Sequence, residues 1–282
     1  MPPHPCTVRV ARDGLAPHGA AIAANVALAD SSNLEAIRAA FDAHEFFLVY
    51  QPIVTLRDRR CVGAEGLIRW RRGDTTVIEA FGFIPVTERT PLAGAITYWV
   101  IDTVASDLGA WLGEHPEAMI GINVPPEILG RGGLEYAARK SGLARYARQL
   151  VLEITERGVP DQLGLDALNE IPATGARVAL DDTTLSGANL ALVARCRFDF
   201  IKVEHSLVAG ISPGEPHPEW LDGLAGLLDK TSLQVIAEGV ETEHQARALN
   251  QAGIQFAQGH LFSVPIAAPE FQRYYRESRA PR

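Results

Sequence analysis

The stretch RVALDDT, residues 177–183, decides how the rest of the chain is interpreted. Val178, Ala179 and Leu180 form an apolar run of strand character, and the carboxylates of Asp181 and Asp182 follow it directly. A buried strand needs no charge at its end, and two adjacent like charges repel each other. The pair therefore needs an explanation, which the neighbouring segments supply.

Short apolar, β-rich runs of this kind recur along the chain. They lie at residues 46–54, 62–70, 119–124, 150–155, 178–182, 200–204, 235–239 and 256–262. Helical periodicity appears between several of them, at residues 93–112, 161–171 and 243–251, and a first helix follows the N-cap Asn33. Strands that alternate with helices are typical of a parallel sheet covered on both faces, and this number of strands is typical of a barrel.

The predicted fold class is therefore α/β, a TIM-like (β/α)8 barrel. Residues 55–61 alone separate the first two runs, which leaves no room for a crossover helix. That first strand pair is predicted to be antiparallel. We expect a flexible N-terminal arm or docking segment over residues 1–33, the barrel over residues 34–270 and a C-terminal tail over residues 271–282.

The bulk composition fits one such barrel and excludes several other classes. The chain has 282 residues, 47% of them hydrophobic, and a formal net charge of -8, which disfavours binding to DNA or RNA backbones. It contains no membrane-length apolar run and no secretory signal, so we expect a soluble, cytoplasmic protein. Cys6, Cys61 and Cys196 are far apart and lack Cys-x-x-Cys spacing, which argues against disulfides and a thiolate zinc site.

A serine-hydrolase interpretation also fails. Residues 210–214, GISPG, match the nucleophile-elbow pattern, but that motif requires a strand before it and a helix after it. Here it lies in a proline-rich loop.

Polar residues stand near the carboxyl ends of nearly all the predicted strands. They are Glu65, Asn123, Glu153, Asp181, Asp182, Lys202, Glu238 and Gln258. In a barrel these positions meet at one rim, the face that carries active sites. Each residue alone is more often a solvated or salt-bridged side chain, so the inference depends on the whole set.

So many carboxylates in a partly buried rim require positive charge. Oxygen ligands with one Asn carbonyl favour Mg²⁺ or Mn²⁺. Adjacent Asp181 and Asp182 could serve two ions about 4 Å apart, the arrangement that clamps both oxygens in a phosphoryl displacement. Lys202 would then hold a water or a phosphate oxygen. Arg69, in the run RWRR, either meets a phosphate or belongs to a solvated basic patch.

At this point the motifs resemble those of a known family. The segments YQPIV, GAEGLIRW, GINVPPEIL, LVLEITE, VALDD, FIKVEHSLV, VIAEGVET and QGHLFSVP are similar, in order, to those of the EAL domain family, over about residues 34–270. The resemblance implies a TIM-like barrel with two metal ions that hydrolyses cyclic di-GMP to linear pGpG in bacterial second-messenger signalling. It also suggests a homodimer, and the short N-terminal arm leaves the input signal to a possible protein partner, to self-association or to the loop at residues 183–190.

The resemblance also implies roles for individual residues. Glu65, Asn123, Glu153 and Asp181 match ligands of the first metal, and Asp182 matches a ligand of the second. Lys202 matches the lysine that orients water, Glu238 a general base or metal partner, and Gln258 a glutamine near the attacking water. Gln51, Leu67, Arg69, Phe262 and Pro265 match positions near the dinucleotide, although core packing explains Phe262 equally well. Glu156 matches the residue that anchors the loop after the two aspartates.

Two departures from the family pattern bear on activity. The signature is Glu65-Gly66-Leu67, with glycine in place of alanine. In TTLSGANL, residues 183–190, both glycines and both aromatic residues of the family pattern are absent at their positions. In addition, Glu204 and His205 replace Asp and Arg, and Val264 replaces Arg. An active phosphodiesterase, a cyclic di-GMP receptor without turnover and a protein-binding regulator therefore all remain open.

Overall fold

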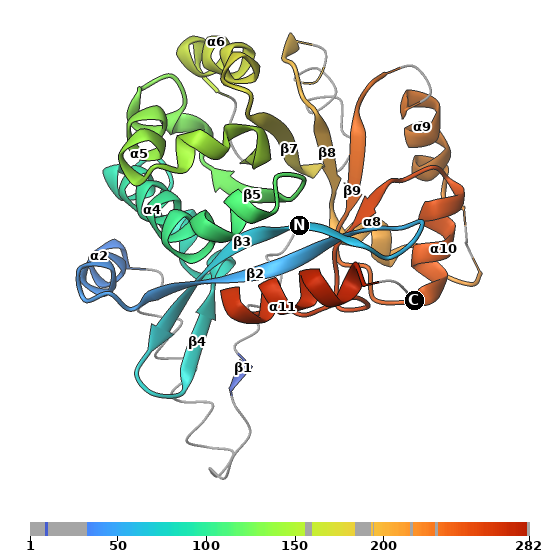
Figure 1. The fold of residues 1–282 in the computed structure, drawn as a ribbon, viewed down its shortest axis with the longest axis horizontal. Helices are drawn as coiled ribbons and strands as arrows, with labels where there is room; N and C mark the ends of the chain where they lie inside the picture. Colours follow the sequence, from blue (N-terminus) through green and yellow to red (C-terminus); the bar gives the residue numbers. More distant parts are fainter. Residues whose placement is uncertain are drawn as a thin grey trace.

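Eight strands close into a barrel. Helices lie around these strands (Figure 1). The computed structural model describes residues 9–10, 33–155, 160–183, 193, 195–214, 217–228 and 231–280. The barrel strands are β2 (Phe46–Thr55), β3 (Cys61–Arg72), β5 (Met119–Val124), β6 (Leu150–Thr155), β7 (Arg177–Thr183), β8 (Phe200–Val203), β9 (Gln234–Ala237) and β10 (Phe256–Ala257). Strand β3 pairs with β5, and this contact closes the ring.

The predicted α/β barrel with an antiparallel first pair is confirmed. Strand β2 runs antiparallel to both of its neighbours, β3 and β10, and the remaining barrel pairs are parallel. Parallel strands need a long crossover connection, whereas only a tight turn joins β2 to β3.

An apolar layer fills the barrel interior below the polar rim. Its buried side chains are Ile53, Met119, Val151, Ala179, Phe200 and Ile236. Because strand side chains alternate in direction, the residue two positions later on each parallel strand faces the same interior, one level higher. Glu153, Asp181 and Lys202 therefore face the interior one level above Val151, Ala179 and Phe200.

Helices cover the outside of the barrel. They are α2 (Leu34–Asp42), α3 (Ile84–Thr87), α4 (Pro91–Glu114), α5 (Gly133–Ser141), α6 (Gln162–Glu170), α8 (His205–Ala209), α9 (Glu219–Leu228), α10 (Glu243–Gln251) and α11 (Ala268–Ser278). Short 3-10 turns are η1 (Ala80–Gly82), η2 (Pro126–Ile128), η3 (Leu143–Gln149) and η4 (Ile171–Thr174). The predicted cap is present, since the Asn33 side chain accepts a hydrogen bond from the Glu35 backbone N–H.

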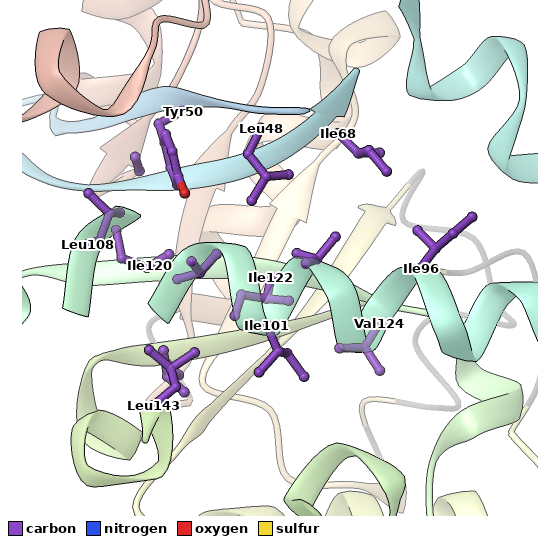
Figure 2. Close-up of a cluster of buried hydrophobic side chains, with 14 of the residues drawn as sticks. Leu48, Tyr50, Ile68, Ile96, Ile101, Leu108, Ile120, Ile122, Val124 and Leu143 are labelled. Atoms are coloured by element: carbon purple, nitrogen blue, oxygen red, sulfur yellow. The ribbon is translucent and has the colours of Figure 1, made fainter. Parts of the chain in front are cut away.

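The largest apolar cluster lies between the barrel wall and α4. Figure 2 shows Ile120, Ile122 and Val124 of β5 together with Ile101 and Leu108 of α4, and all five are buried. Burying such a side chain contributes about 1.5–3 kcal/mol. The outward side chains of β5 therefore anchor α4. The alternate residues of β5 face the barrel interior.

The structure corrects the predicted domain boundary at residue 270. Helix α11 continues to Ser278, and it buries Phe271 and Tyr275 against the barrel and α4. The prediction of a tail from residue 271 is therefore wrong for most of that segment. Pro269 in the first turn and aromatic residues four apart are the helix signals that the prediction overlooked.

Two elements extend the sheet beyond the barrel. Strand β4 (Thr76–Glu79) forms a hairpin with β3, and β1 (Arg9–Val10) pairs with β4. Within the described ranges, none of the helices combines the length and apolar character that a membrane crossing requires.

Candidate metal centre and substrate cleft

The two adjacent aspartates face one cluster because β7 bulges at its end. In a regular strand Asp181 and Asp182 would point to opposite faces. The pairing register between β7 and β8 shifts between Leu180 and Thr183, and Asp182 adopts a left-handed backbone with φ of 51°. This conformation turns Asp182 back, so that its carboxylate lies within 4.8 Å of those of Asp181 and Glu238.

Lys202 occupies the centre of the acidic cluster. Its Nζ lies 2.6 Å from Glu153, 2.7 Å from Glu238, 2.9 Å from Asp181 and 3.0 Å from Glu65. The lysine side chain is only 1% exposed. Moving these charged groups out of water costs a large desolvation free energy, which only close ion-pair geometry can offset. The four contacts of Lys202 have that close geometry.

Amide side chains complete the cluster. Asn123 Nδ2 donates a hydrogen bond of 2.8 Å to Glu65 Oε1, and Gln258 Nε2 donates one of 2.7 Å to Glu65 Oε2. Gln258 Nε2 also lies 3.1 Å from Glu238 Oε1. These contacts fix the orientation of the Glu65 carboxylate from two sides.

The carboxylates of the cluster differ in their affinity for protons. Burial raises the pKa of Glu65, but Lys202, Gln258 and Asn123 outweigh it and hold that pKa below its ordinary value. Burial, together with the Glu65 charge, raises the pKa of Glu153 well above its ordinary value. Burial also raises the pKa of Glu238 to about 8, despite Lys202. Part of the cluster therefore lacks the positive charge that full ionisation needs.

The side chains present fit divalent cations. Carboxylate oxygens of Glu65, Glu153 and Asp181 lie within 4.8 Å of one another, and a second such group joins Asp181, Asp182 and Glu238. Glu153 Oε1 is buried without a hydrogen-bond partner among the described residues. An all-oxygen donor set of this kind suits Mg²⁺ or Mn²⁺, and a shared aspartate suits two ions.

A cleft of about 1230 Å³ opens above this cluster. Its lining includes many residues that the sequence analysis selected, namely Gln51, Glu65, Leu67, Arg69, Asn123, Asp181, Asp182 and Pro265. The cleft lining does not include four of the selected residues, namely Glu153, Lys202, Glu238 and Gln258. Hydrogen bonds and ion pairs connect each of them to Glu65 or to another cluster member. The polar residues that the sequence analysis selected near the strand ends are therefore in contact with one another or line the same cleft.

Phe262, Glu156 and Arg69 differ in what the structure describes of them. Phe262 does not line the cleft; its ring packs against the core and lies 5.0 Å from the Arg59 guanidinium carbon. Glu156 and residues 184–190 of the altered loop lie outside the described residues. Arg69 lines the cleft, where burial lowers the pKa of its guanidinium.

Some cleft residues were not singled out as site residues by the sequence analysis. The cleft lining also includes Phe81, Arg89, Arg131, His205 and His260. The first three lie in connections after strands, where no periodic pattern marks them. His205 and His260 follow the FIKV and AQG motifs closely, so their positions near the rim were a usable signal.

Comparison with known proteins identifies the family. The sequence model described as EAL domain matches residues 34–265. The probable cyclic di-GMP phosphodiesterase PdeG of Escherichia coli (strain K12) is 32% identical over 242 residues, which cover 82% of this chain and 47% of that protein. The cyclic di-GMP phosphodiesterase NbdA of Pseudomonas aeruginosa is 30% identical over 257 residues, which cover 88% of this chain and 33% of that protein. The chain thus spans less than half the length of these relatives.

Solved structures give the same result. The EAL enzyme Bd1971, with cAMP and cyclic di-GMP bound, has a TM-score of 0.75 and 26% identity over 92% of this chain and 72% of that chain. The PaMucR phosphodiesterase in complex with c-di-GMP has a TM-score of 0.75 and 27% identity over 84% of this chain and 98% of that chain. Because the family model matches most of the sequence and the barrel matches these structures, the chain belongs to the EAL domain family.

Proposed function

We propose that this protein binds cyclic di-GMP in the cleft and hydrolyses one of its phosphodiester bonds to give linear pGpG. The observation that carries the proposal is the acidic cluster at the cleft floor, where two overlapping groups of carboxylates surround Lys202. Relatives named as cyclic di-GMP phosphodiesterases support the choice of substrate.

The two carboxylate groups, together with Asn123 beside Glu65, support the choice of metal-binding residues. Glu65, Asn123, Glu153 and Asp181 would hold one Mg²⁺ or Mn²⁺, and Asp182, with Asp181, would hold a second. When bound, the ions supply Lewis-acid activation of the attacking water and neutralise the phosphate charge.

The remaining residues orient the water and the nucleotide. Lys202 and Gln258 hold the attacking water close to Glu238, which accepts its proton. Their positions support this role, since Lys202 Nζ lies 2.7 Å and Gln258 Nε2 lies 3.1 Å from Glu238 Oε1. Arg69 contacts a phosphate at the cleft wall, while Gln51, Leu67 and Pro265 contact the rest of the dinucleotide. Because Phe262 lies outside the cleft lining, we assign it to packing.

A hydrolysis assay tests the proposal. Purified protein is incubated with cyclic di-GMP and Mn²⁺ or Mg²⁺, and chromatography separates the substrate from pGpG. We expect turnover that stops in EDTA and in Glu65→Gln, which keeps the size of the side chain but removes its charge. The exposed Glu135→Gln on α5 is the matched control and should keep full activity. Intact cyclic di-GMP after long incubation with metal would refute the proposal.

A receptor without turnover is the second candidate. The sequence of residues 184–190, which departs from the family pattern after the Asp181–Asp182 pair, favours it. It predicts that calorimetry detects cyclic di-GMP binding to wild type and to Glu65→Gln, with no pGpG from either. The homodimer, the protein partner and the loop-anchoring role of Glu156 remain predictions.

A further inference from the structure

Gly121 faces the barrel interior beside the acidic cluster. Its neighbours Ile120 and Ile122 belong to the outward cluster beneath α4 (Figure 2), so the alternation of the strand points position 121 inward. Gly121 pairs with Glu65 on β3 and with Val151 on β6. It therefore lies one level below Asn123, at the floor of the candidate metal centre.

The space that a side chain would fill at Gly121 is taken by one carboxylate oxygen. A Cβ at this position would lie 1.9 Å from Glu153 Oε1 and 2.8 Å from Glu153 Cδ, whereas the next atom, Glu65 Cα, would be 3.5 Å away. Glu153 Oε1 is the same buried oxygen that lacks a hydrogen-bond partner among the described residues. Glu153 Oε2 accepts a hydrogen bond of 2.6 Å from Lys202.

We propose that Gly121 is a positioning residue that sets how Glu153 presents its carboxylate to a divalent cation. The recess at Gly121 takes Oε1, so that Oε2 faces Lys202 at the centre of the acidic cluster. A methyl group in the recess would rotate the carboxylate and move its charge toward the other acids of the cluster. The inference rests on the metal centre of the proposed function, but its test measures metal binding and does not depend on hydrolysis.

An alanine at position 121 would conflict with the Glu153 side chain and would not strain the backbone. Gly121 is not among the residues with positive φ, so its backbone accepts an alanine. The clash would involve the end of a flexible side chain, which can move without displacing a strand. Gly63, one level lower on β3, provides the contrast, because a Cβ there would lie 1.9 Å from the backbone oxygen of Met119. Substitution of Gly63 would strain the barrel itself.

The test is Mn²⁺ titration of EDTA-treated protein, with the free ion followed by electron paramagnetic resonance. Residues that orient a metal ligand typically contribute about 10–100-fold to metal affinity, so Gly121→Ala should weaken Mn²⁺ binding by about 10-fold or more. Gly109→Ala on α4, where a Cβ would meet nothing within 4 Å, should bind as wild type. Unchanged affinity in Gly121→Ala would overturn the proposal.

A second variant shows whether the effect passes through Glu153. Glu153→Asp shortens the side chain by one methylene and withdraws it from the recess. In that background Gly121→Ala should cause no further loss of Mn²⁺ affinity, and an equal loss would assign the glycine a purely structural role. If Gly121→Ala alone does not fold, recovery of folding in the double variant supports the steric conflict, and failure of the double variant contradicts it.

Discussion

Replacing Lys202 by methionine tests the electrostatic account of the cluster. Met keeps the length and apolar stem of the side chain and removes the ammonium group. Lys202 is 1% exposed, and its Nζ lies between 2.6 and 3.0 Å from four carboxylates. The variant would leave these acids without that shared cation, so we expect a less stable protein in the absence of metal.

The size of the loss follows from the geometry. One pair of unit charges about 2.8 Å apart is worth about 6 kcal/mol at an effective dielectric constant of 20, and the desolvation of Lys202 offsets part of the sum. Removing one partner of a buried ion pair typically costs about 3–5 kcal/mol. We expect a loss in that range, or about 6–10 °C in Tm for a chain of this length.

The assay is urea unfolding in EDTA at pH 8, followed by circular dichroism. Lys140→Met is the matched control, because Lys140 is exposed on α5 and should change stability by less than about 0.5 kcal/mol. Mn²⁺ should restore more stability to Lys202→Met than to wild type, since it would replace the missing positive charge. A loss below about 1 kcal/mol in the variant would refute the reasoning.

Three other predictions concern the scaffold. Tyr50→Phe removes a hydrogen bond of 2.8 Å from a buried hydroxyl to Asp107, and should cost about 1.5 kcal/mol or more in urea unfolding; no change would mean that the bond adds nothing to stability. Phe271→Ala should cost about 3–5 kcal/mol, and a loss under 1 kcal/mol would restore the prediction of a dispensable tail. Burial raises the pKa of the Cys61 thiol to about 12, so iodoacetamide at pH 8 should modify this thiol only after unfolding. Peptide mass mapping measures the modification, and rapid labelling of the folded protein would contradict the prediction.

The sequence predicted the barrel and the cluster because both follow from short-range rules. A strand alternates its side chains, and parallel strands bring their carboxyl ends to one rim, so Glu153, Asp181 and Lys202 could be placed together without coordinates. The same rules locate Asn123 and Glu238. Local patterning was sufficient wherever the strand stayed regular.

Other features depend on tertiary contacts that a linear pattern does not contain. The left-handed conformation of Asp182 arises where β7 loses register with β8, and the adjacent letters alone do not reveal that bulge. The recess at Gly121 depends on the rotamer of Glu153 on the next strand. Phe81 and Arg89 reach the cleft through the β4–α4 connection, whose path is set by packing against the barrel.

The most direct test of the central claim is a crystal of this protein soaked in Mn²⁺ and examined by anomalous diffraction. We expect one peak in contact with Glu65, Glu153 and Asp181, and a second in contact with Asp181 and Asp182. Peaks confined to other parts of the surface, or carboxylates that point away from one another, would contradict the account.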